Sequence, residues 1–464
     1  MVAPFSFVFF AYIANLILNH ACTYSTYIRF VIAIILVELL LIQGYFVRIG
    51  TSEVSYQLFG NCMLLIYSMV FIVKNHIKVT YTDFVYGFLF LIAALIGVIH
   101  QSLVPYDGLV MTYDSQGSWD AYTLGANNKG FPVISWTRVL SIYVTFITAT
   151  LTIFIFHSCL RKEIIKHILA TVNKVLKWNI YFVSLEFILK NIVKSDLLLK
   201  LEILVLGEGT NTYSTLIIRN GLYQLQGLTR EPSHLALTLF FTIVLYVIGK
   251  MLDDKHFVKT NYAYIAYIVL LMIVSGSFAS YLYIMVIVCW GIYLLMKRSH
   301  SGLKYIIFFF SFTVIVLLAY LIVNGYVDSS TYLGKRLNLA NELAGAVISN
   351  SWYGMGGDSA LPRFLSLYDT FSDFLERPLF GMGLSVQISH GGFVNVLSDI
   401  GIAGLFCWIC LVFNKFTYYY SPILILLLGS NLLLGNVFET LGLTYFIFII
   451  ACFRKNNFPK YNSF

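Results

Sequence analysis

Residues 84–100, FVYGFLFLIAALIGVIH, contain no Asp, Glu, Lys or Arg at any position. An α-helix rises about 1.5 Å per residue, so about 20 such residues cross a hydrocarbon core of roughly 30 Å. The apolar residues follow one another without alternating with polar ones, which favours a helix that is surrounded by apolar groups on all sides. We therefore interpret this stretch as a membrane-spanning helix.

The same kind of run recurs along the whole chain of 464 residues. Hydrophobic residues make up 59% and charged residues 11% of the sequence, whereas soluble domains carry about 25% charged residues. The predicted spans are 4–20, 27–47, 57–73, 84–100, 137–159, 168–192, 233–251, 262–276, 280–296, 304–324, 393–414, 420–435 and 438–453. Thirteen spans use about 260 residues, which leaves no room for a large soluble domain. The sequence predicts an all-α integral membrane protein, one polytopic domain over 1–464 with about 13 (12–14) transmembrane helices, and excludes soluble enzymes and nucleic-acid-binding modules.

The basic residues give this topology an orientation. The formal net charge is +8, and short loops on the cytoplasmic side of a membrane carry an excess of Lys and Arg. Five such loops contain Lys74, His76 and Lys78; Arg161, Lys162 and Lys166; Lys250, Lys255 and Lys259; Lys297, Arg298 and Lys304; and Arg454, Lys455 and Lys460. Placing all five in the cytoplasm is self-consistent and puts the C-terminus inside. Part of the positive charge could also attract an anionic substrate.

This orientation leaves three long segments on the outer side, 101–136, 193–232 and 325–392. Long loops are usually functional. Within the last, 361–375 has apolar residues at helical spacing with Arg363, Asp369 and Asp373 between them. We expect an amphipathic helix that either lies on the membrane surface or packs over the spans.

Several kinds of chemistry have no signature in this sequence. There is no P-loop, no H-E-x-x-H and no G-x-S-x-G. No cluster of His, Cys and carboxylates has the spacing of metal ligands, and no outer D-x-D could hold Mg²⁺ on a sugar nucleotide. The seven cysteines lie mostly inside apolar runs and imply no disulfide framework. We expect no metal and no cofactor, and a donor that is already activated.

The most informative stretch runs from Arg219 to His234 and ends in Arg230-Glu231-Pro232-Ser233-His234. It leads directly into the apolar run 233–251, and Pro232 suits the first position of a helix. A helix N-terminus beside an arginine attracts phosphate. A plain interfacial cap with an arginine reaching to the surface is the alternative.

A second stretch begins at Glu376-Arg377-Pro-Leu-Phe-Gly-Met-Gly383 and continues with Ser389-His390-Gly-Gly-Phe-Val-Asn395. His390 precedes the predicted span 393–414 and is flanked by glycines, which permit close approach of a ligand to the backbone. A histidine at an interface can equally be structural.

Together the two stretches resemble a known family. REPSHLA is similar to the Glu-Pro-Ser element of Wzy-type O-antigen polymerases, and ERPLFGMG…SHGGFVNVLSDIGIAGL resembles the PLFGxG…HNxxL element of the O-antigen ligase and polymerase superfamily. The motifs cover about a tenth of the chain. The sequence departs from the family in two places. Gly391 stands where the family has Asn after the histidine. The repeated Arg-x10-Gly motif of some polymerases is also not met at Arg219, because the residue eleven positions later is Arg230 and not Gly.

The resemblance implies a GT-C-type glycosyltransferase that acts on undecaprenyl-pyrophosphate-linked repeat units at the periplasmic face of the bacterial inner membrane. His390, Glu231 and Arg230 would be catalytic, with His390 as the general base. Arginines would bind the pyrophosphate without a metal; the candidates are Arg219, Arg230, Arg363, Arg336 and Arg377. The implied partners are lipid-linked glycans, membrane lipid and a protein that regulates chain length, with no nucleic acid.

Two alternatives remain open at this point. An O-antigen ligase would perform the same chemistry with lipid A core as acceptor. A lipid-linked oligosaccharide flippase or other transporter would line a central cavity with charged residues. The two intramembrane carboxyl groups weighed for such a role are Glu38, in the predicted span 27–47, and Glu186, in 168–192. We expect these two carboxyl groups to form interhelical hydrogen bonds or to be protonated.

Overall fold

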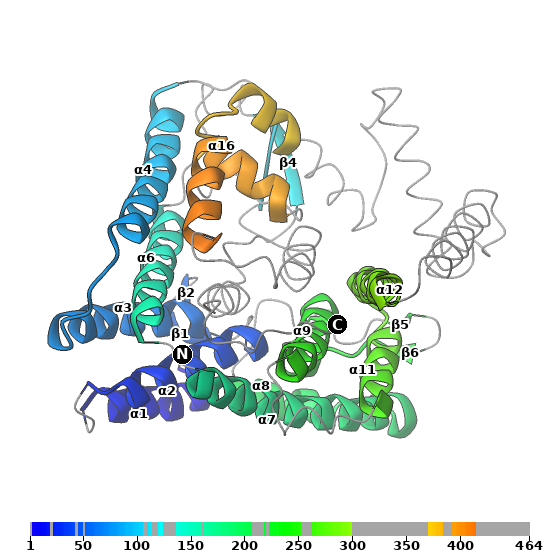
Figure 1. Cartoon of the computed structure of the whole chain (residues 1–464). Helices are drawn as coiled ribbons and strands as arrows, with labels where there is room; N and C mark the ends of the chain where they lie inside the picture. Colours follow the sequence, from blue (N-terminus) through cyan, green and yellow to red (C-terminus); the bar gives the residue numbers. More distant parts are fainter. Residues whose placement is uncertain are drawn as a thin grey trace.

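The computed structural model describes residues 2–18, 22–41, 45–49, 52–104, 109–113, 119–123, 136–159, 162–206, 218–219, 222–229, 231–251, 262–298, 370–383 and 392–413. These residues are mostly helical (Figure 1). The helices are α1 (Pro4–Leu18), α2 (Tyr24–Leu40), α3 (Tyr56–Lys74), α4 (Tyr81–Leu103), α6 (Trp136–Cys159), α7 (Lys162–Phe187), α8 (Leu197–Leu206), α9 (Pro232–Met251), α11 (Tyr262–Val274), α12 (Phe278–Arg298) and α16 (Gly392–Phe413). The predicted spans 304–324, 420–435 and 438–453 lie outside the described residues.

In the part of the chain that the structure describes, three short antiparallel hairpins interrupt the helices. They pair β1 (Tyr45–Ile49) with β2 (Ser52–Ser55), β3 (Leu109–Tyr113) with β4 (Trp119–Thr123), and β5 (Ile218–Arg219) with β6 (Leu222–Tyr223). The prediction of one span over 27–47 was therefore wrong at its end, because α2 stops at Leu40 and 45–49 is a strand. An apolar run alone does not separate helix from strand, and Tyr-Phe-Val-Arg-Ile is rich in residues that favour strands.

The segment 193–232, which we predict to lie on the outer side, also has more structure than predicted. A π-helical turn, η1 (Ile188–Val193), continues α7 and ends at Lys194, whose φ of 59° is left-handed. The apolar helix α8, the β5–β6 hairpin and a 3-10 turn, η3 (Gly227–Thr229), follow before α9 begins. Helix α9 packs against α7, α11 and α12.

Two described helical segments are long and apolar enough to cross a membrane, namely α3 and residues 139–156 of α6. The remaining apolar helical segments are shorter; α11 has 13 residues, or about 20 Å at the rise of an α-helix. Two such segments are also compatible with buried helices of a soluble protein, so the thirteen-span topology remains a prediction.

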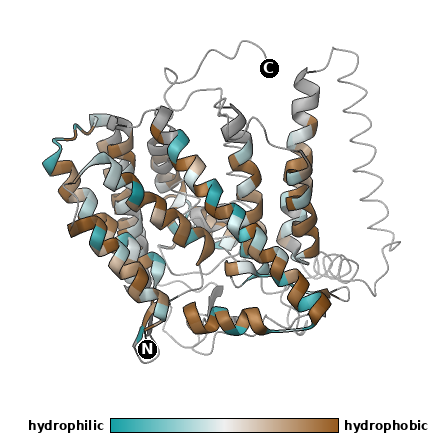
Figure 2. Ribbon diagram, turned by 90° about the horizontal axis from the view of Figure 1, so that it is seen from below, coloured by the Kyte–Doolittle hydropathy of each residue, from teal (hydrophilic) through white to brown (hydrophobic). Residues whose placement is uncertain are grey.

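Many helices are hydrophobic along much of their length (Figure 2). Several of them expose large apolar side chains, while their buried side chains include some polar ones. The exposed set includes Phe7, Val8 and Phe10 of α1, Ile66, Met69, Val70 and Val73 of α3, and Phe84, Phe88, Leu95 and Ile99 of α4. Where α2, α3 and α6 meet, the buried amide Nδ2 of Asn61 donates to Glu38 Oε1 at 3.3 Å and to Thr145 Oγ1 at 3.4 Å. Glu38 therefore makes the interhelical hydrogen bond that the sequence led us to expect.

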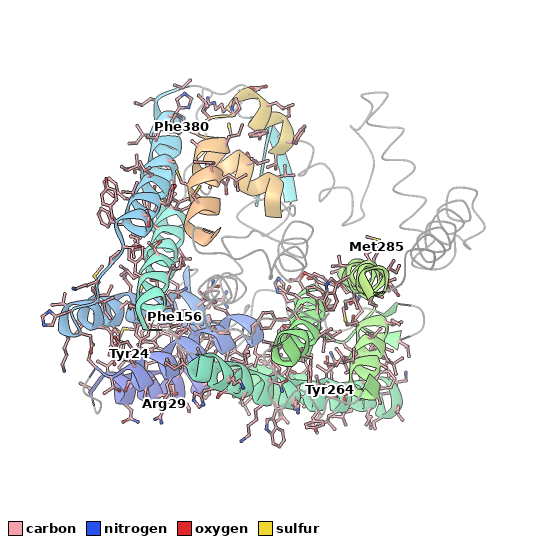
Figure 3. The ribbon with its side chains drawn as sticks, in the orientation of Figure 1. Tyr24, Arg29, Phe156, Tyr264, Met285 and Phe380 are labelled. Atoms are coloured by element: carbon pink, nitrogen blue, oxygen red, sulfur yellow. The ribbon has the colours of Figure 1, made fainter. Side chains whose placement is uncertain are left out.

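Helix α16 is broken at Gly401, where φ is 64° and ψ is −173°. Residues 378–383 lie in this break: the amide of Ile402 donates to the Pro378 carbonyl at 2.8 Å, and the amide of Gly383 donates to the Asp399 carbonyl at 3.1 Å. A Cβ atom at Gly401 would overlap the Leu379 carbonyl. The glycines of this stretch thus permit close packing of the chain against itself. Phe380 lies near the upper end of α4 and α16 (Figure 3).

Residues 370–376 form the described end of the amphipathic helix predicted over 361–375; residues 361–369 lie outside the described residues. The helix ends before Pro378, as predicted, and the exposure of its side chains bears on the two placements that the sequence left open, on the membrane surface or packed over the spans. Asp373 is fully buried, whereas Phe371 and Leu375 are 46% and 61% exposed. The polar side of this turn packs on the protein and its apolar side faces outward, which is typical of a segment that contacts lipid.

Candidate functional site

The residues around the start of α9 form the candidate site. Helix α9 begins at Pro232, as the sequence predicts, because proline needs no amide partner in the first turn and its φ already suits a helix. Glu231 precedes it, and its carbonyl accepts the first helical hydrogen bond from the amide of Leu235 at 2.9 Å. The first N–H groups of a helix have no partner within the helix and carry a partial positive charge. This end of α9 therefore suits an anionic ligand.

Glu231, Ser233 and His234 form a compact polar group at this helix end. The hydroxyl of Ser233 donates to Glu231 Oε1, and His234 Nδ1 lies 3.6 Å from Glu231 Oε2. The side chains of Glu231 and His234 are 25% and 27% exposed, so a ligand can reach them. A carboxylate beside Nδ1 leaves Nε2 as the nitrogen for exchange with a ligand. The sequence did not single out His234, although its spacing of three residues from Glu231 on a helix was a usable signal.

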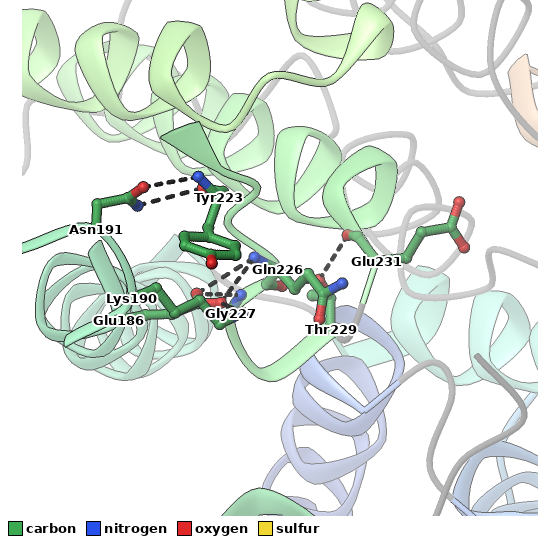
Figure 4. Close-up of polar contacts among 8 residues, drawn as sticks. All are labelled: Glu186, Lys190, Asn191, Tyr223, Gln226, Gly227, Thr229 and Glu231. Carbon is green, nitrogen blue, oxygen red and sulfur yellow. Dashed lines mark hydrogen bonds and ion pairs between the residues drawn. The ribbon is translucent and has the colours of Figure 1, made fainter. Parts of the chain in front are cut away.

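The segment before Glu231 is buried and fixed by α7. The carboxylate of Glu186 accepts hydrogen bonds from the amides of Gln226, at 3.1 and 3.2 Å, and of Gly227, at 2.8 Å (Figure 4). Lys190 Nζ lies 2.5 Å from Glu186 Oε1, and both side chains are less than a tenth exposed. For Glu186 the sequence led us to expect an interhelical hydrogen bond or a protonated acid. The contacts differ from the first alternative, since its partners are a lysine of the same helical stretch and two amides of an irregular segment.

Two further contacts fix the same segment. Thr229 Oγ1 donates to the Gln226 carbonyl at 2.6 Å and lies 3.1 Å from the Glu231 carbonyl. Gln224 Nε2 donates to the Gly276 carbonyl at 3.1 Å, in the turn between α11 and α12. The polypeptide that enters the start of α9 is therefore attached to α7 and to the α11–α12 turn.

The other predicted site residues fall in different places. Arg230, Arg336, Arg363 and His390 lie outside the described residues, and Arg219 is described only as a backbone position in β5. Arg377 follows the 370–376 turn, and its Nη2 donates to the Val104 carbonyl at 3.1 Å, which attaches the turn to the end of α4. Burial lowers the pKa of the Arg377 guanidinium, opposed by Glu376 and Asp373. Helix α4, to whose end Arg377 is bonded, lies apart from α9 (Figure 1).

Within the described residues, no group of three or more His, Cys, Asp or Glu side chains could hold a metal ion. No protein-family model matches this chain, and no curated protein sequence matches it.

Proposed function

We propose that this protein polymerises undecaprenyl-pyrophosphate-linked oligosaccharide repeat units into O-antigen or a related surface polysaccharide, at the periplasmic face of the bacterial inner membrane. The observation that carries the proposal is the Arg230-Glu231-Pro232-Ser233-His234 element, which resembles the Glu-Pro-Ser element of O-antigen polymerases and opens α9 at Pro232. Its helix end, arginine and Glu-His pair are suited to a lipid pyrophosphate and a sugar hydroxyl.

The distribution of polar and apolar side chains supports a membrane location. Soluble monomers rarely expose contiguous apolar patches larger than a few hundred Å², yet α1, α3 and α4 each expose several large apolar side chains. Helices α2, α3 and α6 bury amide, hydroxyl and carboxyl groups in hydrogen-bonded contacts with one another. Helices in lipid bury polar groups against one another in this way.

The proposed reaction needs no nucleotide, because the donor already carries a good leaving group. A hydroxyl oxygen of one lipid-linked repeat unit attacks the anomeric carbon of another, and the bond from that carbon to the pyrophosphate oxygen breaks. The hydroxyl proton passes to a base, and undecaprenyl pyrophosphate departs with its charge held by arginines. Arg230 is the first candidate for this role, with Arg219, Arg336, Arg363 and Arg377 as further candidates.

Three side chains are candidates for the base or for its orientation. His390 fits the histidine of the second resembling element. Glu231 lies between Ser233 and His234, which suits an orienting role. His234 is the third candidate, because its Nδ1 lies 3.6 Å from Glu231 Oε2. A well-placed base contributes about 10²- to 10⁴-fold in rate.

The decisive experiment has a cellular and a purified arm. Deletion of the gene should leave single repeat units on lipid A core, whereas loss of a ligase leaves none and loss of a flippase leaves no periplasmic lipid-linked units. The purified protein should then convert lipid-linked repeat units into a ladder in the presence of a chelator. Arg230→Ala should abolish long chains at unchanged protein level, and Arg230→Lys should restore them only partly, because lysine lacks the planar fork of arginine. An unchanged ladder with Arg230→Ala would remove this residue from the site.

A further inference from the structure

Side chains at the end of α7 and in η1 hold the short segment Tyr223–Gly227. Two of them, Glu186 and Asn191, bind its backbone (Figure 4), and a third, Lys194, contacts the Tyr223 ring. Glu186 accepts from the amides of Gln226 and Gly227. Asn191, in the η1 turn, donates through Nδ2 to the Tyr223 carbonyl at 3.2 Å and accepts from the Tyr223 amide at 2.7 Å. Lys194 Nζ lies 5.3 Å from the centre of the Tyr223 ring. We call Glu186, Asn191 and Lys194 the α7 clamp.

The α7 clamp depends on the π-helical turn. Glu186 lies in the last turn of α7, while Lys190 and Asn191 lie in η1 and Lys194 ends it. Isolated π-turns inside helices are often found at functional sites. Here Glu186, just before the turn, binds the amides of Gln226 and Gly227. Asn191, within the turn, binds the amide and the carbonyl of Tyr223. The two side chains therefore act on the same segment.

Burying a carboxylate is costly unless its hydrogen bonds and charge are matched. Glu186 has both, since it meets the Lys190 ammonium and two amides. An apolar side chain could hold the segment at a lower desolvation cost than a buried carboxylate, but it would not fix the direction in which the amide groups of the segment point. Charge-assisted hydrogen bonds do set that direction.

The clamped segment is close in sequence to the proposed site. Gly227 and Thr229 belong to η3, Arg230 follows Thr229 directly, and Glu231 directly precedes α9. Gly227 has a φ of 56°, and its neighbours Val183 and Leu235 belong to α7 and α9. Fixing the amides at 226 and 227 therefore fixes where the next residues enter the helix end.

We propose that Glu186 is a positioning residue of the glycosyl-transfer site, which acts by fixing the segment that carries Arg230 and Glu231. This proposal rests on the function proposed above. Glu186 itself touches no substrate in this account; its effect passes through the amides of Gln226 and Gly227.

The test compares two buried glutamates in the purified polymerisation assay. Glu186→Gln keeps the shape and removes the charge. Glu38→Gln makes the same change between α2 and α3, where the carboxyl group meets Asn61. We expect Glu186→Gln to lower kcat by about 10²-fold, the cost of a displaced catalytic group, with KM changed less than about threefold. Glu186→Asp should recover part of the rate, and Glu38→Gln should retain wild-type kcat.

Two more measurements separate positioning from general loss of stability. Amide hydrogen exchange at Gln226 and Gly227 should speed up in Glu186→Gln and not in Glu38→Gln. In an Arg230→Lys background, Glu186→Gln should cost much less than in the wild type, because both changes act on one group. Should Glu186→Gln fail to fold, Glu186→Gln/Lys190→Met removes both buried charges together and takes its place.

The outcomes distinguish this proposal from the function on which it rests. If the wild-type protein makes no ladder, the proposed function fails, and this role for Glu186 fails with it. If the wild type makes a ladder and the Glu186 variants match it in kcat, the function stands and the positioning role is refuted. Equal losses in Glu186→Gln and Glu38→Gln, or fully multiplicative losses with Arg230→Lys, would also refute it.

Discussion

Glu231 lies at the start of α9, and its side chain is close to that of His234. Its carboxylate accepts a hydrogen bond from the Ser233 hydroxyl, and its Oε2 lies 3.6 Å from His234 Nδ1. A carboxylate in this position orients an imidazole, as in other carboxylate–histidine pairs. This geometry favours an orienting role for Glu231 over that of the base itself.

The base can be identified by comparing three variants in the metal-free polymerisation assay. We expect His390→Ala to lower the rate by about 10²- to 10⁴-fold while the protein level holds. Glu231→Gln should cost less, because the amide still accepts from Ser233. If His234→Ala is inactive and His390→Ala polymerises at the wild-type rate, His234 is the base and Glu231 its partner. A requirement for added Mg²⁺ would contradict the arginine-based account of the leaving group.

Gly227 offers a test of the backbone that leads to the site. Its φ of 56° lies in the left-handed region, and a Cβ there would lie 3.0 Å from Val183 Cγ2 and 3.1 Å from Leu235 Cδ1. Gly227→Ala should destabilise the protein by at least about 1 kcal/mol and lower the polymerisation rate.

Gly291 provides the matched control. It lies in α12, where an added Cβ meets nothing within 4 Å. Gly291→Ala should be neutral or stabilise by up to about 1 kcal/mol, because alanine favours the helix. Thermal unfolding in detergent measures both variants, and equal midpoints for the two would contradict the assignment of strain to Gly227.

At the scale of elements, the start of α9 could be predicted and the end of α7 could not. Pro232 after a polar residue and before a long apolar run is a local signal. The contact between Glu186 and Gly227 joins residues 41 positions apart, and no local pattern reports such a distance. The π-turn likewise arises from tertiary contacts, because the residues of 188–193 carry no marker that separates them from an α-helix.

In residues 370–376, the spacing of apolar residues predicts that one side of the helix is apolar, but not whether that side is buried or exposed. The spacing of Phe371 and Leu375 correctly predicted one apolar side. Which side turns inward depends on the surroundings, and in lipid the rule for soluble proteins no longer applies. The buried side here contains Thr370 and Asp373.

Asp373 should make the stability of this turn depend on pH. Burial, together with Glu376, raises the pKa of its carboxyl group to about 8, against the opposing charge of Arg377. In the unfolded chain the group ionises near pH 4, so the folded state binds the extra proton between about pH 4 and 8. Stability from this group is therefore greatest below pH 4, falls as pH rises to about 8, and changes little above it.

We expect the unfolding midpoint in detergent to fall between pH 6 and pH 8 in the wild type. Asp373→Asn removes the ionisation and should flatten this dependence. Asp196→Asn is the control, since Asp196 is half-exposed and pairs with Lys200 at the surface, and it should keep the wild-type slope. A slope that survives in Asp373→Asn would show that another group is responsible.

At the scale of the whole molecule, the basic loops predict how the chain is oriented. Reporter fusions at Lys162, Lys255 and Lys297 should give cytoplasmic signals, and fusions near Trp352 should give periplasmic ones. A cytoplasmic signal near Trp352 would place the segment 325–392 on the wrong side for the proposed reaction. Matched fusions at Lys74 test whether α3 crosses the membrane, because Lys74 ends that helix.

The hydrogen bonds that join Glu38, Asn61 and Thr145 have a consequence for biogenesis. Of the three helices that carry these residues, α2 is synthesised first. Its Glu38 carboxyl group then has no partner until Asn61 of α3 is made, and the Thr145 hydroxyl of α6, which binds Asn61, is made later still. A lone helix with such a group is held poorly by acyl chains. Early helices of this protein would therefore remain beside the insertion machinery until α6 arrives, and a nascent chain truncated before Trp136 should be extracted from the membrane and degraded.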